Sequence, residues 1–216
     1  MKKGFVFDLD GVITDTAEYH FSAWRNLADS IGIEIDRHFN EQLKGISRME
    51  SLERILIYGN KENDFTKQQK LELAHRKNAE YLKSLQSLNP NDLLPGVKDF
   101  FSEIKKINIP CSLASASLNA PFIIEKLAIK DYFDGIVDPG TLKHTKPHPE
   151  IYIKGAEILR LNPRDCIGFE DAPAGIQSIK TAGMYAVGIE SNEPLIDADL
   201  RVFRLDELSV KCLLRV

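Results

Sequence analysis

Short apolar runs alternate with segments of helical period along most of this chain, and this alternation restricts the fold more than any other feature. The apolar runs span residues 4–10, 109–115, 134–138, 166–171 and 185–190. Between the later runs, apolar residues recur at the spacing of amphipathic helices. Strands that alternate with helices form a parallel sheet with helices on both faces. The sequence therefore predicts an α/β fold with a parallel sheet flanked by helices.

Residues 16–92 interrupt this alternation, because they contain helical patterns and no convincing strand. In "HFSAWRNLADSIG", for example, the aromatic and aliphatic residues fall on one face of a helix. The Asn- and Pro-containing segment 87–97 is the expected linker back to the sheet. We therefore expect an α-helical domain at 16–92, inserted after the first strand of an α/β domain formed by 1–15 and 93–216.

The charged residues are balanced, since 28 lysines and arginines and 32 aspartates and glutamates give a net charge of -4 without long runs of one sign. This composition offers no electrostatic footprint for nucleic acid or an anionic membrane. No apolar stretch approaches the ~20 residues of a membrane-spanning helix, and "MKKGFVFDLDG" meets charge too early for a signal peptide. We expect a soluble, cytoplasmic monomer with no nucleic acid or membrane partner, although no sequence feature specifies the oligomeric state.

The cysteines, Cys111, Cys166 and Cys212, are widely spaced and lie in apolar contexts. Neither a CxxC pair nor a Cys/His cluster is present, which disfavours a zinc site or a catalytic thiol. The expectation is three buried, reduced thiols.

Polar residues that could take part in binding or catalysis follow the predicted strands. Ligands of open parallel sheets bind beyond the carboxyl ends of the strands, so these positions can converge on one edge. The residues concerned are Asp8, Asp10, Ser115, Ser117, Lys146, Glu170 and Asp171.

Four carboxylates in one crevice would repel one another unless a cation neutralised them, and hard oxygen ligands of this kind suit Mg²⁺. One aspartate would remain free to attack phosphorus, as in aspartyl-phosphate chemistry. Lys146 and Ser115 would stabilise charge on the transferring phosphoryl oxygens. The set predicts Mg²⁺-dependent phosphoryl transfer.

Each of these residues also has a structural explanation when it is considered alone. Asp15 and Asp171 could cap a turn or helix, and Ser115 could be a small turn residue. Lys146 could be a solvated loop lysine, and the pair 170–171 could begin a helix that ends at Gly183. Their joint placement at successive strand ends favours the functional interpretation.

The segments "DLDGVITDT", "LASAS", "TKPHPE" and "GFEDAPAGIQSIKTAG" resemble the four ordered motifs of the haloacid dehalogenase (HAD) superfamily. The resemblance implies a Rossmann-like core with a small all-α helical-bundle cap that opens and closes. It also implies that Asp8 is the nucleophile, that Asp10 is the general acid/base, and that Ser115 and Lys146 hold the phosphoryl group. The implied Mg²⁺ ligands are Asp8, Asp10 through its backbone carbonyl, Glu170 and Asp171.

Within the superfamily, "TAEYHFSAW", "LKGISRMESL", "RKNAEY" and "SASLNAPFIIEKL" are similar to segments of its sugar-phosphate mutases. This implies interconversion of β-glucose 1-phosphate and glucose 6-phosphate through a phospho-aspartyl enzyme and β-glucose 1,6-bisphosphate. The implied substrate-binding residues are Thr16, His20, Gly45, Arg48, Ser51, Lys77, Ser115, Ala116, Ser117, Asn119 and Lys146. The chain departs from many members at Leu118, where they carry lysine, and this removes a cation from the binding loop.

Other interpretations remain open. A sugar-phosphate phosphatase could use the same scaffold, although Arg48 favours a mutase, which needs a second phosphate anchor. A phosphonate hydrolase is disfavoured because Asp10 is present, and a catalytically silent sugar-phosphate binder because nucleophile, acid/base and metal ligands occur together. His20 could be a packed, hydrogen-bonded histidine, Lys77 part of a charged helix face, and Arg48 an ordinary solvated arginine.

Overall fold

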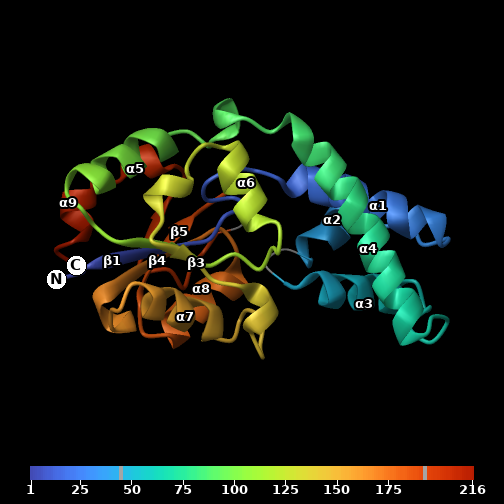
Figure 1. Cartoon of the computed structure of the whole chain (residues 1–216). Coiled ribbons are helices and arrows are strands. Elements are labelled where there is room, and N and C mark those ends of the chain that lie inside the picture. The colour runs from blue at the N-terminus through green and yellow to red at the C-terminus, as the bar shows by residue number, and fades with distance from the viewer. Residues whose placement is uncertain (44–45, 192–193) are drawn as a thin grey trace. The chain divides into compact units, whose positions relative to one another are not determined.

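The structure is a computed structural model that describes residues 1–43, 46–191 and 194–216. Its Cα positions group into two compact units, drawn in Figure 1. The core unit comprises residues 1–15 and 88–216, and the helical unit comprises residues 16–87.

A parallel sheet forms the centre of the core unit, in the order β3-β2-β1-β4-β5-β6. The strands are β1 (Gly4–Phe7), β2 (Cys111–Leu113), β3 (Gly135–Ile136), β4 (Cys166–Glu170), β5 (Tyr185–Ile189) and β6 (Leu200–Val202). The predicted parallel sheet is confirmed, and the first five strands lie within the predicted runs. The edge strand β6 was not predicted, because "LRV" is too short to show a periodic pattern.

Helices cover both faces of this sheet. The helices of the core unit are α5 (Val97–Lys106), α6 (Ala120–Lys126), α7 (Glu150–Ile158), α8 (Pro173–Thr181) and α9 (Val210–Leu213). Figure 1 shows α5 and α9 on one face and α7 and α8 on the other.

Side chains of β1 alternate between these two layers, as the pleat of a strand requires. Phe5 and Phe7 pack with Phe169 and Phe100 of α5, and the rings of Phe7 and Phe169 stack with centroids 4.4 Å apart. Val6 points to the opposite layer and belongs to the cluster that α7 and α8 complete. β1 is therefore buried on both faces. Its packing fixes the position of the backbone from which Asp8 and Asp10 follow.

The helical unit has its own apolar core. Its helices are α1 (Ala17–Ser30), α2 (Arg37–Glu41), α3 (Arg48–Tyr58) and α4 (Lys67–Ser84). Trp24, Leu52 and Leu73 bring α1, α3 and α4 into one buried cluster. Ser47 and Thr66 accept hydrogen bonds from backbone N–H groups at the starts of α3 and α4 and so define where these helices begin. The described part of 16–87 contains no strand, in agreement with the helical patterns of the sequence.

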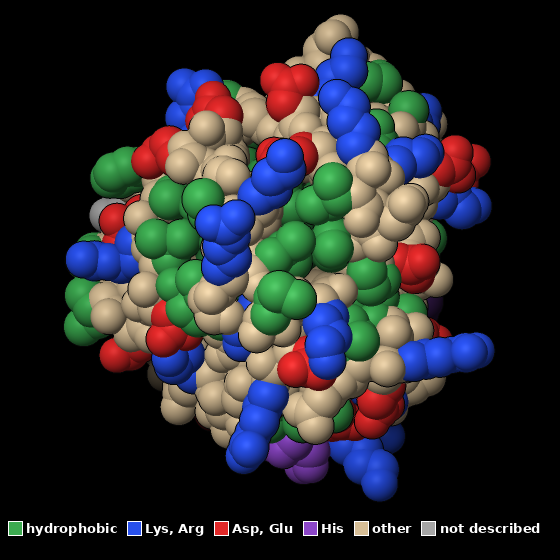
Figure 2. Space-filling model, turned by 90° about the vertical axis from the view of Figure 1, so that its left-hand side faces the viewer, with side chains coloured by type: hydrophobic (Ala, Val, Ile, Leu, Met, Phe, Trp, Pro, Cys, Tyr) green, Lys and Arg blue, Asp and Glu red, His purple; other side chains and the backbone are tan. Residues whose placement is uncertain are grey.

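Charges of both signs are interspersed on the face of the molecule shown in Figure 2. Among the described residues, no helix has the length and apolar character that crossing a membrane requires.

All three cysteines are free thiols, but the expectation that all are buried is wrong for one of them. Cys111 and Cys166 are buried, and burial raises the pKa of the Cys166 thiol to about 11. Cys212 is exposed, because the short helix α9 turns Val210 and Leu213 inward instead.

Candidate active site

The carboxyl ends of β2, β1 and β4 lie side by side at one end of the sheet. Phe7 of β1 pairs with Leu113 of β2 on one side and with Phe169 of β4 on the other. One residue further on, Asp8 N donates to Phe169 O (3.0 Å), and Ala114 N donates to Phe7 O (2.7 Å). The polar residues that follow these strands therefore start from adjacent positions.

A glycine shapes the turn after Asp10. Gly11 has a φ of +75°, in the left-handed region that glycine adopts most readily, and its N–H donates to Thr14 O at 2.8 Å. A Cβ at this position would overlap the carboxylate of Asp171. Glycine thus allows both the turn and the close approach of Asp171 to the backbone beside Asp10.

Lys146 binds two carboxylates at this edge. Its Nζ donates to Asp8 Oδ1 at 2.8 Å and to Glu170 Oε2 at 2.7 Å. Asp8, Lys146 and Glu170 are only 6%, 3% and 0% exposed. Burial and the neighbouring Glu170 raise the pKa of Asp8 to about 7, although Lys146 opposes the shift. Burial favours a lower pKa for Lys146, but the two carboxylates outweigh it and raise the pKa, so the side chain stays a cation.

Tyr152 of α7 also contacts Glu170. Its hydroxyl donates to Glu170 Oε2 at 2.6 Å and lies 3.2 Å from Phe169 O. Burial and the nearby carboxylates raise the pKa of Tyr152 well above its ordinary value, so the hydroxyl keeps its proton. Sequence reasoning missed this residue; the available signal was a tyrosine among the apolar positions of the segment after Lys146.

Three of the predicted metal ligands come together. One side-chain oxygen from each of Asp8, Glu170 and Asp171 lies within 4.8 Å of the others. Among the described residues, Glu170 Oε1 is the only buried side-chain nitrogen or oxygen without a hydrogen-bond partner. A buried carboxylate oxygen without a donor is unfavourable unless a cation meets it. The donor set and this oxygen fit a hard divalent cation. Asp10, the fourth predicted ligand, is half-buried in the turn before Gly11.

The loop after β2 carries the predicted phosphoryl-binding hydroxyl. Ser115 is buried, and its Oγ accepts a hydrogen bond from Ser117 N at 3.1 Å. Ser117 Oγ accepts from Asn119 N at 3.2 Å, so two successive side-chain turns hold the loop. Ala116 between them is half-buried, and Leu118 is 56% exposed.

In the helical unit, Thr16, His20 and Lys77 gather around Tyr81, which the sequence analysis did not select. Lys77 Nζ lies 2.8 Å from His20 Nδ1 and over the rings of Trp24 and Tyr81, 4.7 and 4.6 Å from their centroids. The Thr16 and Tyr81 hydroxyls lie 2.9 Å apart. Lys77 is 2% exposed, so its interpretation as part of a charged helix face is wrong. His20 is packed and hydrogen-bonded, and burial, with help from Lys77, lowers its pKa well below the usual value.

The remaining predicted residues of the helical unit lie at the start of α3. Arg48 is the first residue of the helix and is half-buried, and this burial lowers its pKa. Ser51 is buried, and its Oγ donates to Ser47 O at 3.1 Å. Gly45 lies outside the described residues.

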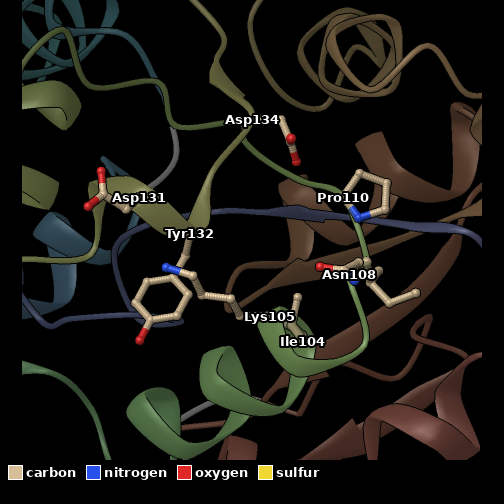
Figure 3. A pocket seen from close by; sticks show the side chains of 8 residues that line it. Ile104, Lys105, Asn108, Pro110, Asp131, Tyr132 and Asp134 are labelled. Carbon is tan, nitrogen blue, oxygen red and sulfur yellow. The ribbon is translucent and has the colours of Figure 1, made fainter.

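A separate pocket of about 210 Å³ is open to solvent near the amino ends of β2 and β3 (Figure 3). Pro110, just before β2, and Asp134, just before β3, contribute to its wall together with Lys105 and Tyr132. It belongs to the amino ends of the strands and is distinct from the acidic site at their carboxyl ends.

The sheet, the strand-end carboxylates and the buried lysine are those of a phosphoryl-transfer α/β fold, and the chain belongs to the haloacid dehalogenase-like hydrolase family, which it matches over residues 2–183. A β-phosphoglucomutase from Bacillus subtilis (strain 168) is 51% identical over 98% of this chain and 93% of the relative. A crystal structure of β-phosphoglucomutase from Clostridium difficile is 47% identical, covers 100% of this chain and 96% of its own, and superposes with a TM-score of 0.96. A fructose-1-phosphate phosphatase from Escherichia coli (strain K12) is 29% identical over 86% of this chain and 95% of the relative.

Proposed function

We propose that this chain is a Mg²⁺-dependent phosphomutase that interconverts β-D-glucose 1-phosphate and D-glucose 6-phosphate. The observation that carries phosphoryl transfer is the buried Asp8 carboxylate, held at 2.8 Å by Lys146 beside Glu170 and Asp171. A mutase is favoured over a phosphatase by the 51% identity with a β-phosphoglucomutase, against 29% with a fructose-1-phosphate phosphatase.

Asp8, Glu170 and Asp171 would hold Mg²⁺ together with the backbone carbonyl of Asp10. Glu170 Oε1, which has no hydrogen-bond partner among the residues that the structure describes, supports this assignment. When bound, Mg²⁺ supplies positive charge that offsets the charge of the transferring phosphoryl group.

Asp8 is the proposed nucleophile. Phosphorylated Asp8 first transfers its phosphoryl group to β-glucose 1-phosphate: the 6-hydroxyl oxygen bonds to phosphorus, the bond between phosphorus and Asp8 breaks, and Asp10 accepts the hydroxyl proton, which gives β-glucose 1,6-bisphosphate. After the bisphosphate has turned around, a carboxylate oxygen of Asp8 bonds to the phosphorus of the other phosphate, the bond from that phosphorus to its sugar oxygen breaks, and Asp10 protonates the leaving oxygen to give glucose 6-phosphate. Lys146 and Ser115 stabilise charge on the phosphoryl oxygens throughout.

The helical unit carries the candidate for the second phosphate contact. Arg48 is the first residue of α3, and a guanidinium at the N-terminus of a helix suits an anion. Thr16, His20, Ser51 and Lys77 are the other proposed contacts from this part of the chain. We also propose that residues 16–92 act as a cap domain.

A coupled assay tests the proposal. Purified protein receives β-glucose 1-phosphate, Mg²⁺ and a trace of β-glucose 1,6-bisphosphate, and glucose 6-phosphate and inorganic phosphate are both measured. Glucose 6-phosphate is the expected main product. If inorganic phosphate dominates, the protein is a phosphatase and the mutase assignment fails.

Two substitutions identify the residues responsible. Asp8→Asn removes the nucleophilic carboxylate and should abolish either product. Arg48→Ala should lower formation of glucose 6-phosphate more than any release of phosphate, because only the mutase reaction needs a second phosphate contact. Equal losses of both products would contradict the role assigned to Arg48.

A further inference from the structure

The hydroxyl of Tyr152 is buried in an otherwise apolar part of the core, where the aromatic ring alone would fill the space. The side chain is 0% exposed and belongs to the apolar cluster that α7 and α8 form with the sheet. Burying a hydroxyl is unfavourable unless it is hydrogen-bonded, whereas phenylalanine would fill nearly the same volume without a polar atom. The hydroxyl therefore needs an acceptor. It lies 3.2 Å from Phe169 O and closer, 2.6 Å, to Oε2 of the proposed metal ligand Glu170.

The two oxygens of Glu170 have different surroundings. Oε2 accepts from Tyr152 at 2.6 Å and from Lys146 at 2.7 Å. Oε1 is equally buried and, in the described part of the chain, has no hydrogen-bond partner. Two donors on one oxygen fix the rotation of the carboxylate and leave the other oxygen for a cation.

The backbone fixes the position of Tyr152 as well. Gly155, three residues along α7, packs so closely on β1 that a Cβ there would lie 2.5 Å from Val6 Cγ1. Ser112 Oγ of β2 donates to Gly155 O at 2.9 Å. α7 is thus held tightly against the sheet, and the Tyr152 hydroxyl has little freedom to move away from Glu170.

We infer that Tyr152 is a positioning residue for the divalent cation: its hydroxyl occupies Glu170 Oε2 and so orients Oε1 toward the metal. The inference rests on the proposed function, in which Glu170 is a metal ligand. Lys146 alone would hold the Glu170 carboxylate in its orientation less firmly, because the same ammonium also binds Asp8. Tyr152 is bonded only to the Glu170 side of this pair and would keep Glu170 in place when the Asp8 carboxylate reacts.

The test measures metal binding directly, without substrate. Mn²⁺ serves as the probe for the Mg²⁺ site, and its dissociation constant is determined for the wild type, Tyr152→Phe and Tyr185→Phe. Partners that orient metal ligands are worth about 10- to 100-fold in affinity. We expect Tyr152→Phe to weaken Mn²⁺ binding by about 10-fold. Tyr185→Phe removes a hydroxyl from the amino end of β5, whereas the proposed metal site lies at the carboxyl ends of the strands. This substitution should leave the affinity unchanged.

Thermal unfolding with and without Mg²⁺ separates positioning from a merely structural role. A structural role lowers the melting temperature equally in both conditions, whereas a positioning role reduces the gain that Mg²⁺ produces. If the wild type binds Mn²⁺ and Tyr152→Phe binds it equally well, the inference is overturned and the proposed function stands. If the wild type binds neither ion, the proposed metal site itself fails.

A wild-type measurement covers the case in which Tyr152→Phe does not fold. In protein with isotope-labelled tyrosine, the hydroxyl proton of a short buried hydrogen bond gives a separate resonance. That resonance should shift when Mg²⁺ is added. A resonance that does not respond to the metal would overturn the inference.

Discussion

Lys146 Nζ lies 2.8 Å from Asp8 Oδ1, although 138 residues separate the two in the sequence. The same ammonium binds Glu170, so one cation compensates two buried carboxylates. Removing one partner of such a buried group leaves an uncompensated charge, which costs far more than the loss of a surface ion pair. The lysine therefore serves the stability of the fold as well as the proposed chemistry.

Lys146→Met should damage both properties. The substitution keeps most of the side-chain volume but leaves two buried carboxylates without their cation, so we expect the free energy of unfolding to fall by about 3–5 kcal/mol without metal. Phosphoryl transfer should fall by about 10²- to 10³-fold, because a charge that stabilises the transferring group is lost. Denaturant unfolding and the coupled mutase assay measure the two effects.

Lys143→Met is the matched control for this experiment. Lys143 lies on the same loop, but its side chain is exposed. Its substitution should change stability by no more than about 0.5 kcal/mol. Near wild-type turnover in Lys146→Met would refute the role of Lys146.

Gly175→Ala tests how closely α8 packs on Glu170. Alanine is normally more favourable than glycine within a helix by about 1 kcal/mol. Here the sign should reverse, because a Cβ at Gly175 would overlap the Glu170 carboxylate. We expect a loss of about 1–3 kcal/mol in stability, as for other overpacked cores, together with weaker Mn²⁺ binding. Gln177→Ala on the exposed face of α8 is the control and should show neither effect; a stabilised Gly175→Ala protein would contradict the packing described here.

The sheet could be predicted from sequence because its buried strands leave apolar runs that end in polar residues. The same feature identified Asp8 and Glu170, because each lies at the carboxyl end of its strand, whereas Lys146 was identified on the loop that follows the third strand. The edge strand β6 was not predicted, because its three residues are too few to show a periodic pattern and only Val202 is buried.

The surroundings of Tyr152 and Lys77 could not be predicted, for a different reason. A helical pattern shows which face of a helix is buried but not what a polar atom on that face meets in space. Tyr152 counts as one more apolar residue in such a pattern, and its bond to Glu170 depends on how α7 is docked on the sheet. Lys77 counts as polar, yet Trp24 and Tyr81 cover its charge inside the helical unit.

The thiols should differ sharply in reactivity. Burial raises the pKa of both Cys111 and Cys166, whereas Cys212 is exposed. A chromogenic disulfide reagent at pH 8 should therefore modify one thiol per native chain quickly and all three only after unfolding. Cys212→Ser should remove the fast reaction, and Cys111→Ser should leave it intact. Rapid modification of more than one thiol in the native protein would contradict the burial of Cys111 and Cys166.

His20 should make the helical unit sensitive to mild acid. Burial, reinforced by the cations Lys77 and Arg48, lowers the pKa of His20 well below 6.5 in the folded state. The unfolded chain therefore binds more protons than the folded chain below pH 6.5, and stability falls as the pH decreases through this range. Between pH 7.5 and 5.5 the loss should be about 1 kcal/mol. Trp24, the only tryptophan in the sequence, lies in the helical unit, so its fluorescence can report the unfolding.

His20→Gln cannot titrate and should lose this part of the pH dependence, even if the variant is less stable at every pH. His75→Gln is the matched control, because His75 is exposed on α4, two residues before Lys77, and should retain the wild-type slope. An unchanged slope in His20→Gln would show that the histidine is not held neutral in the folded protein. The steeper acid sensitivity would then have to arise elsewhere, and the contact between His20 Nδ1 and Lys77 Nζ would need another explanation.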